Sequence, residues 1–173
     1  MMSSFGNCLS PVRHRGRSLG ESESPSTGQG QRQIARCHAG RTGTPTAQGG
    51  MICDTTFLSD LHDEAGRPGP AIAFLAAHRT APSLVTVISA GEVAVIFDTN
   101  QQARQFLARY RILRLLPEIA YVAAGIDREL IGVGQRLSEN DNWIAGFCRY
   151  YAQPLISRDG AFDRVRGLRR LRY

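Results

Sequence analysis

Short apolar runs alternate with longer amphipathic stretches from residue 51 to the end of the printed sequence. The apolar runs predict buried strands at 51–54, 84–88, 112–115, 154–157 and 168–172. The stretches between them have a helical period and predict helices at 56–62, 70–78, from 89 onward, 101–110, 117–133 and 141–151. Strands that alternate with helices are typical of a parallel sheet covered on both faces, so we expect an α/β fold.

Capping residues predict where several of these helices begin and end. Ser89 and Glu92 have the spacing of a capping box, so we expect a helix to open at Ser89. Asn140 is the expected N-cap of the helix over 141–151. Gly134 is expected to end the preceding helix.

The first fifty residues differ from the rest in composition. They are rich in Ser, Gly, Gln, Thr and Arg and contain almost no apolar pairs. Such a segment buries too little surface to offset the entropy lost on ordering, so we expect residues 1–50 to be disordered. The abrupt change at Gly49-Gly50-Met51 suggests the hypothesis that Met51 is the native start. The folded domain is then expected to comprise residues 51–173.

Charge and cysteine content narrow the class of protein. The net charge is +6, and all 21 basic residues are arginines, but residues 51–173 carry only +2 of that charge. A mildly basic body permits a nucleic-acid partner without requiring one. The four cysteines form no C-x-x-C pair, and no apolar core of a signal peptide precedes them. Both observations argue against a secreted disulfide scaffold. Without an apolar run of about 18 residues, we expect a cytoplasmic protein with no membrane partner.

Four acidic residues lie near the ends of predicted strands. Asp54 ends the first strand, Glu92 follows the second, Asp141 begins the helix before the fourth, and Asp159 follows the fourth. Each one alone is more simply explained as a cap or turn residue. Because sites in parallel sheets form beyond the carboxyl ends of the strands, we expect the four to share one rim. Clustered carboxylates need a compensating cation, and hard oxygen ligands suit Mg²⁺ or Mn²⁺.

The stretches that carry these acids resemble, in order, the motifs of PIN domains, especially those of VapC-type toxins. They read MICDTTFLSDL from residue 51, VISAGE from 87, NDNWIAG from 140 and PLISRD from 154. The resemblance covers essentially all of 51–173 and none of 1–50. It implies a three-layer α/β/α fold with a five-stranded parallel sheet. It also implies metal-dependent cleavage of RNA by the toxin of a VapBC-type toxin–antitoxin pair, with a small antitoxin as partner and a homodimeric state.

The resemblance assigns the acids to catalysis. Asp54, Asp141 and Asp159 are expected to bind one or two Mg²⁺ or Mn²⁺ ions, with Glu92 as a further ligand or a group that positions water. A metal lowers the pKa of a bound water, and the resulting hydroxide can attack phosphorus in line.

Four neighbouring residues are expected to support the site or to contact the substrate. Thr55 and Ser157 carry hydroxyls that could orient carboxylates. Asn140 could hydrogen-bond a ligand, although capping is the simpler role. Arg158 could contact an RNA phosphate because it neighbours the rim. The C-terminal stretch as a whole is basic, and its arginines could either contact RNA phosphates or form the solvated face of an edge strand. They are Arg158, Arg164, Arg166, Arg169, Arg170 and Arg172.

Two other functions are alternatives to a nuclease. One is a PIN-fold protein used for RNA binding or regulation, with little or no catalytic turnover. The presence of all four acids argues against it, because a site without catalytic activity need not keep them. The other is a phosphoryl-transfer receiver domain, which usually needs a lysine at its rim. The chain has no lysine, which argues against the second alternative.

Overall fold

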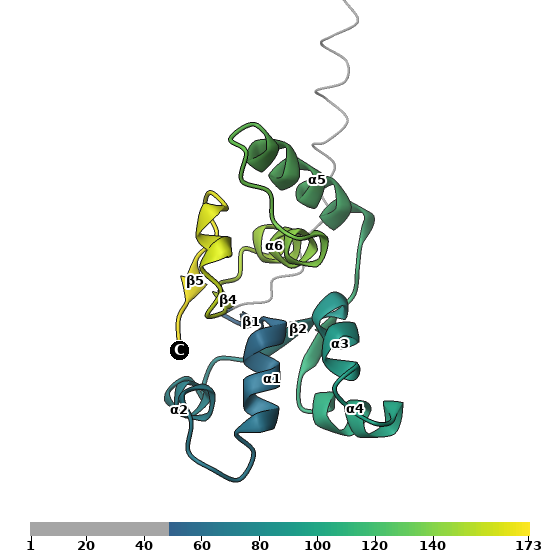
Figure 1. The fold of residues 1–173 in the computed structure, drawn as a ribbon, viewed down its shortest axis with the longest axis vertical. Helices are drawn as coiled ribbons and strands as arrows, with labels where there is room; N and C mark the ends of the chain where they lie inside the picture. The colour runs from purple at the N-terminus through teal and green to yellow at the C-terminus, as the bar shows by residue number, and fades with distance from the viewer. Residues whose placement is uncertain (1–48) are drawn as a thin grey trace, which may run out of the picture. The chain divides into compact units, whose positions relative to one another are not determined.

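The computed structural model describes residues 49–173, whose strands form one parallel sheet between two layers of helices (Figure 1). The strand order is β3-β2-β1-β4-β5, and every neighbouring pair is parallel. The predicted α/β fold with a five-stranded parallel sheet is therefore confirmed. The strands are β1 (Met51–Cys53), β2 (Ser83–Thr86), β3 (Arg111–Leu113), β4 (Leu155–Ile156) and β5 (Arg170–Leu171).

Helices cover both faces of this sheet. Figure 1 shows α1 to α4 on one side of the strands and α5 and α6 on the other. The helices are α1 (Thr55–Asp63), α2 (Pro70–Ala77), α3 (Val87–Ala94), α4 (Asn100–Leu107), α5 (Pro117–Ile131), α6 (Glu139–Tyr151) and the 3₁₀ helix η2 (Gly160–Arg164). The expected extension at 1–50 lies, apart from its last two residues, outside the described residues.

The alternation of side chains along the central strand divides the core in two. In β1, Ile52 points into a cluster with residues of α5 and α6, whereas Met51 and Cys53 point into a cluster with residues of α1 to α4. Successive strand residues face opposite sides of a sheet, so a fully buried three-residue strand supplies both cores. Cys53 and Cys148 are buried free thiols, and burial raises the pKa of Cys53 to about 12.

The strand predicted at 84–88 is shorter than expected, and the helix after it begins earlier. β2 ends at Thr86, whose hydroxyl accepts the backbone N–H of Ser89 at 2.9 Å. Thr86 is therefore the N-cap of α3, and the prediction that Ser89 opens this helix is wrong. The partner strands explain the difference, because β2 pairs with β1 as far as Val85 and with β3 as far as Thr86.

Helix α6 also begins before the predicted position. Ser138 is its N-cap and accepts the backbone N–H of Asp141. The prediction that Asn140 caps this helix is wrong, because Asn140 lies within the first turn and points its side chain elsewhere. Gly134 follows α5 at φ +68°, a left-handed conformation that suits glycine at the end of a helix. Within residues 49–173, no helix combines the length and apolar character needed to cross a membrane.

Candidate active site

The four predicted acids belong to four elements at the carboxyl ends of the strands. Asp54 directly follows β1 and is the N-cap of α1, whereas Glu92 lies in α3, which follows β2. Asp141 lies in the first turn of α6, and Asp159 follows β4 as the N-cap of η2. The parallel topology brings these elements to one edge of the sheet, as the positions of the acids near the strand ends predicted.

Asp54 is the most enclosed of the four carboxylates, with 3% of its surface exposed. Its Oδ1 accepts the backbone N–H of Thr55 at 2.8 Å. Its Oδ2 accepts the hydroxyls of Thr56 at 2.8 Å and Ser157 at 2.7 Å. Burial raises the pKa of Asp54, the hydrogen bonds oppose that shift, and the charge of Asp141 adds to it. None of the groups that shift the pKa of Asp54 is a cation, so hydrogen bonds alone favour its ionised form.

The Ser157 hydroxyl connects two of the acids. It donates to Asp54 and accepts the backbone N–H of Asp159 at 3.0 Å. Ser157 is fully buried at the end of β4. The predicted supporting hydroxyl therefore lies between the first and fourth acids and fixes the direction in which the chain leaves the sheet.

Glu92 is held by two side chains from other helices. Its Oε2 accepts the hydroxyl of Thr55, and its Oε1 accepts the side-chain amide of Asn140 at 2.7 Å. Glu92 does not close a capping box at its own helix, as one interpretation of the sequence proposed. Its two hydrogen bonds instead join the beginning of α1 and the first turn of α6 to α3.

Asp141 is half-buried and paired with its own N-cap. Ser138 accepts the backbone N–H of Asp141 and donates its hydroxyl to Oδ2 of the same residue. Burial raises the pKa of Asp141, the hydroxyl of Ser138 lowers it, and the charges of Asp159 and Glu92 raise it further. The charge of Asp141 thus acts on Asp54, and the charges of Asp159 and Glu92 act on Asp141, so Asp141 is the acid that feels two of the others.

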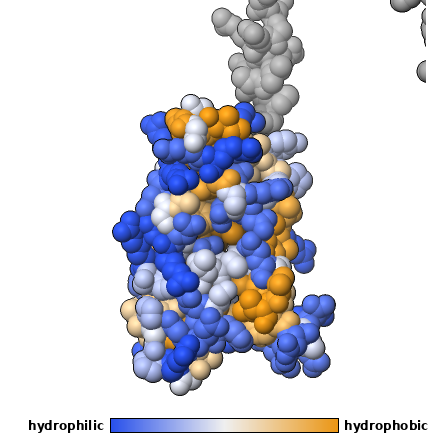
Figure 2. Space-filling view, in the orientation of Figure 1, coloured by the Kyte–Doolittle hydropathy of each residue, from blue (hydrophilic) through white to orange (hydrophobic). Residues whose placement is uncertain are grey.

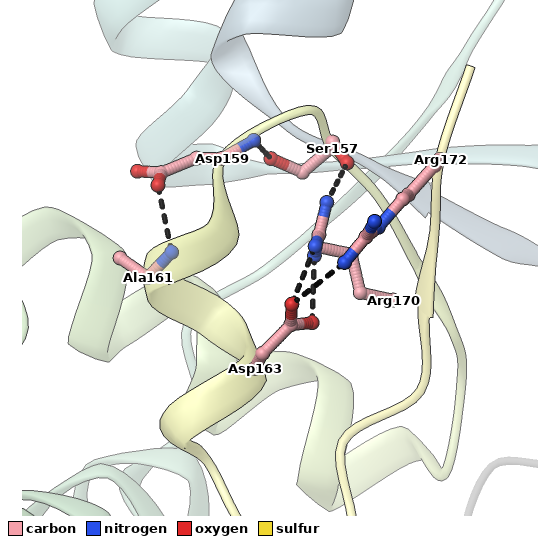
Figure 3. A network of polar contacts seen from close by, with 6 residues as sticks. All are labelled: Ser157, Asp159, Ala161, Asp163, Arg170 and Arg172. Atoms are coloured by element: carbon pink, nitrogen blue, oxygen red, sulfur yellow. Dashed lines mark hydrogen bonds and ion pairs between the residues drawn. The ribbon is translucent and has the colours of Figure 1, made fainter.

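Asp159 and Arg158 point in different directions. Oδ1 of Asp159 accepts the backbone N–H of Ala161 at 2.8 Å, which caps η2 (Figure 3). The Arg158 guanidinium forms a 3.0 Å ion pair with Asp60, which also accepts the hydroxyl of Tyr173 at 2.6 Å. Arg158 thus borders the acids but is held by α1.

The donor set suits a hard divalent cation in its chemistry. It consists of carboxylates only, and two of them have a raised pKa partly because neighbouring acids repel their negative charge, a repulsion that a cation would relieve. Within residues 49–173, no three His, Cys, Asp or Glu side chains form a preformed metal-binding group. Glu92, Asp141 and Asp159 each hydrogen-bond a neighbouring group instead. The assignment of Asp54, Asp141 and Asp159 as cation ligands therefore stays a prediction.

Several residues that shape the site were not predicted as parts of it. Ser138 orients Asp141, and the S-x-x-D spacing from Ser138 was the signal that could have identified it. Thr56 supports Asp54 from two residues further along the chain. Asp163 in η2 forms ion pairs with Arg170 and Arg172 beside Asp159 (Figure 3).

Comparisons with known proteins agree with this architecture. The family model of the PIN domain matches residues 51–168. No curated protein matches the chain. Among solved structures, VapBC2 from Rickettsia felis bound to a DNA fragment from their promoter has a TM-score of 0.62 at 16% identity, over 71% of this chain and 98% of that one. VapBC-1 from nontypeable Haemophilus influenzae has a TM-score of 0.59 at 19% identity, over 70% and 96%.

A third solved structure is described as VapBC-5 from Mycobacterium tuberculosis, a member of the VapBC family of toxin–antitoxin systems. Its TM-score is 0.51 at 22% identity, over 73% of this chain and 100% of that one. Identities this low show a shared fold. The family model is more specific, because it spans well over half of the chain and includes all four acids. The chain therefore belongs to the PIN domain family.

Proposed function

We propose that this protein is a metal-dependent endoribonuclease that hydrolyses RNA phosphodiester bonds and acts in the cytoplasm as the toxin of a VapBC-type pair. PIN domains are generally nucleases, so membership of the family supports a hydrolase. The observation that carries the proposal is the placement of Asp54, Glu92, Asp141 and Asp159 at one edge of the sheet, where hydrogen bonds through Ser157 and Asn140 connect their elements. A site that had lost its catalytic role would not need to retain four acids at one edge of the sheet.

In this proposal, Asp54, Asp141 and Asp159 hold one or two Mg²⁺ or Mn²⁺ ions. A bound divalent cation supplies an activated water and neutralises charge that develops on the phosphate. Ser157 keeps Asp54 and the Asp159 backbone in register, and Thr55 and Asn140 keep Glu92 directed to the same edge. Each Glu92 oxygen retains a second lone pair, so Glu92 can still orient a water molecule.

Exposed apolar side chains support a protein partner. Val87, Val95 and Ile96 are 41%, 83% and 44% exposed, and Figure 2 shows an apolar patch over α3 and the segment leading to α4. On α5, Tyr121 is 77% exposed. Apolar patches of this kind are typical of interaction surfaces. We propose that a small antitoxin and a second copy of the chain cover these surfaces of α3, the segment that follows it, and α5.

The test is cleavage of labelled single-stranded and structured RNA by the purified full chain, with Mg²⁺, Mn²⁺ or EDTA. Asp141→Asn is compared with Asp63→Asn, which removes an equal charge from an exposed position at the end of α1. We expect cleavage that EDTA and Asp141→Asn abolish and Asp63→Asn preserves. Wild-type cleavage by a folded Asp141→Asn protein would contradict the site assignment. Tight RNA binding without cleavage would favour the regulatory alternative.

A further inference from the structure

A pocket lies beside Asp159, between the residues that flank it and the C-terminal strand. Its volume is about 340 Å³, and it is lined by Arg158, Gly160, Arg170, Arg172 and Tyr173. Three guanidinium groups therefore border one hollow next to a carboxylate of the candidate active site. A Cβ added to Gly160 would meet no atom within 4 Å, so this part of the pocket wall is open.

The three arginines differ in how firmly they are held. Only 4% of the Arg170 side chain is exposed, and it donates to both carboxylate oxygens of Asp163 and to the carbonyl of Ser157 (Figure 3). Arg170 therefore ties β5 to β4 and η2. The side chains of Arg158 and Arg172 are 63% and 74% exposed, so their guanidinium groups face solvent.

The guanidinium groups of Arg158 and Arg172 are each positioned by an ion pair that leaves further N–H donors available. Arg158 pairs through Nη1 with Asp60, which Tyr173 also contacts, and Arg172 pairs through Nη2 with Asp163. A guanidinium has five N–H donors in a planar fork that matches two phosphate oxygens. One ion pair each leaves most of those donors for a ligand.

We propose that this pocket binds a backbone phosphate of the RNA substrate, next to the bond that is cut. The inference rests on the proposed ribonuclease function and adds to it a subsite formed by Arg158 and Arg172. Figure 3 shows the Asp159 carboxylate turned toward Ala161, away from the guanidinium groups gathered at Asp163. The pocket therefore takes a neighbouring phosphate, while the four acids face the scissile one.

A purely structural role for the two exposed arginines predicts a different result. Ion pairs as exposed as these contribute little to stability. If they served only to fasten β5, their removal would change folding slightly and would leave the salt dependence of RNA binding unchanged. A phosphate subsite predicts the reverse, because each phosphate contact with a single strand contributes about 0.7 to the slope of log Kd against log salt.

The test is RNA binding by the full chain in an Asp141→Asn background with EDTA, so that no cleavage occurs. The probe is a fluorescein-labelled single-stranded RNA of mixed sequence, titrated at several salt concentrations. Arg158→Gln/Arg172→Gln is compared with Arg104→Gln/Arg128→Gln, which removes the same charge from exposed positions on α4 and α5. Arg158→Lys/Arg172→Lys keeps the charge but loses the planar fork. Thermal unfolding verifies that each variant is folded.

We expect the Arg158/Arg172 glutamine variant to bind roughly tenfold more weakly at low salt, with a slope reduced by about 0.7, and the control to match the parent. The lysine variant should keep the slope and lose part of the affinity. If the glutamine variant and the control bind alike, the subsite is wrong while the nuclease stands. If the parent binds no RNA and the wild-type chain cuts none, the proposed function and the subsite both fail.

Discussion

The side-chain amide of Asn140 donates a 2.7 Å hydrogen bond to Glu92, which lies 48 positions earlier in the chain. The other oxygen of the same carboxylate accepts the hydroxyl of Thr55. Glu92 thus connects three helices, α1, α3 and α6, at the edge where the other acids lie. Its direction is set by residues outside its own helix.

The first prediction concerns this connection. Asn140→Ala or Thr55→Val should lower RNA cleavage about 10- to 100-fold, because loss of a hydrogen bond to a charged group frees Glu92 to turn away. Single-turnover cleavage and Mn²⁺ titration measure the effect. Asn100→Ala, at an exposed position on α4, is the matched control and should leave both unchanged. Normal cleavage by both site variants would show that Glu92 needs no support from them.

The order of strands and helices could be predicted because it depends on apolar periodicity, which the sequence displays directly. The starts of α3 and α6 could not, because two capping patterns overlap in each case. Thr86 and Ser89 both fit an N-cap, and the ends of the neighbouring strands select Thr86. Ser138 and Asn140 compete in the same way, and Ser138 is selected.

The positions of the acids could be predicted, but their contacts could not. That Asp54, Glu92, Asp141 and Asp159 share an edge follows from parallel topology, which places the ends of parallel strands together. Contacts such as that between Ser157 and Asp54 span 103 positions. Only the pairing of β1 with β4 brings these two residues together, and its register cannot be predicted from the residues next to either one.

The second prediction separates the structural and chemical roles of Asp54. Asp54→Ala should lower the free energy of unfolding by about 2–4 kcal/mol, because it removes the N-cap of α1 and leaves the hydroxyls of Thr56 and Ser157 without their acceptor. Asp54→Asn keeps a capping oxygen and should stay within about 1 kcal/mol of the wild type. Urea unfolding measures both values, and RNA cleavage should be lost in both. Cleavage retained by Asp54→Asn would remove Asp54 from the catalytic set.

The third prediction concerns acid stability at Asp163. Hydrogen bonds from Arg170, together with the positive charges of Arg170 and Arg172, lower the pKa of Asp163 from 3.8 to about 2. A carboxyl with a folded-state pKa below its unfolded value stabilises the fold above about pH 4 and loses that contribution as the pH falls toward 2. Asp163→Asn should therefore lower stability at pH 6 and have little effect near pH 2. Urea unfolding across this range measures the difference, and an equal deficit at both pH values would contradict the ion-pair explanation.

Asp54 and Asp141 should oppose this trend. Burial raises the pKa of each carboxyl, so the ionised form is less favoured in the folded chain than in the unfolded one. As the pH rises from the ordinary pKa of 3.8 past the raised folded-state pKa, ionisation of these two carboxyls therefore lowers the free energy of unfolding. The acid-side comparison must therefore be made between wild type and Asp163→Asn at each pH, so that the contribution of the other carboxyls cancels.

The last prediction concerns the contact between α5 and α6, which sets the position of Asp141. Gly146 passes so close to Ala123 that a Cβ added to it would lie 2.9 Å from the Ala123 Cβ. Gly146→Ala should therefore destabilise the fold by about 1–3 kcal/mol and reduce cleavage, because α6 must move away from α5. Gly125→Ala, where an added Cβ meets nothing within 4 Å, is the control and should stabilise α5 by up to about 1 kcal/mol.

Exchanging the two side chains tests whether that single contact is responsible. In the double variant Ala123→Gly/Gly146→Ala, the new methyl group on α6 faces a glycine on α5, so the 2.9 Å contact is removed and the next nearest atom is the Cα of residue 123 at 3.3 Å. Ala123→Gly alone should cost about 1 kcal/mol through its lower helix propensity. If the clash limits the approach of the helices, the double variant should regain cleavage that Gly146→Ala loses. A double variant no more active than Gly146→Ala would place the defect in α6 itself and not in its packing against α5.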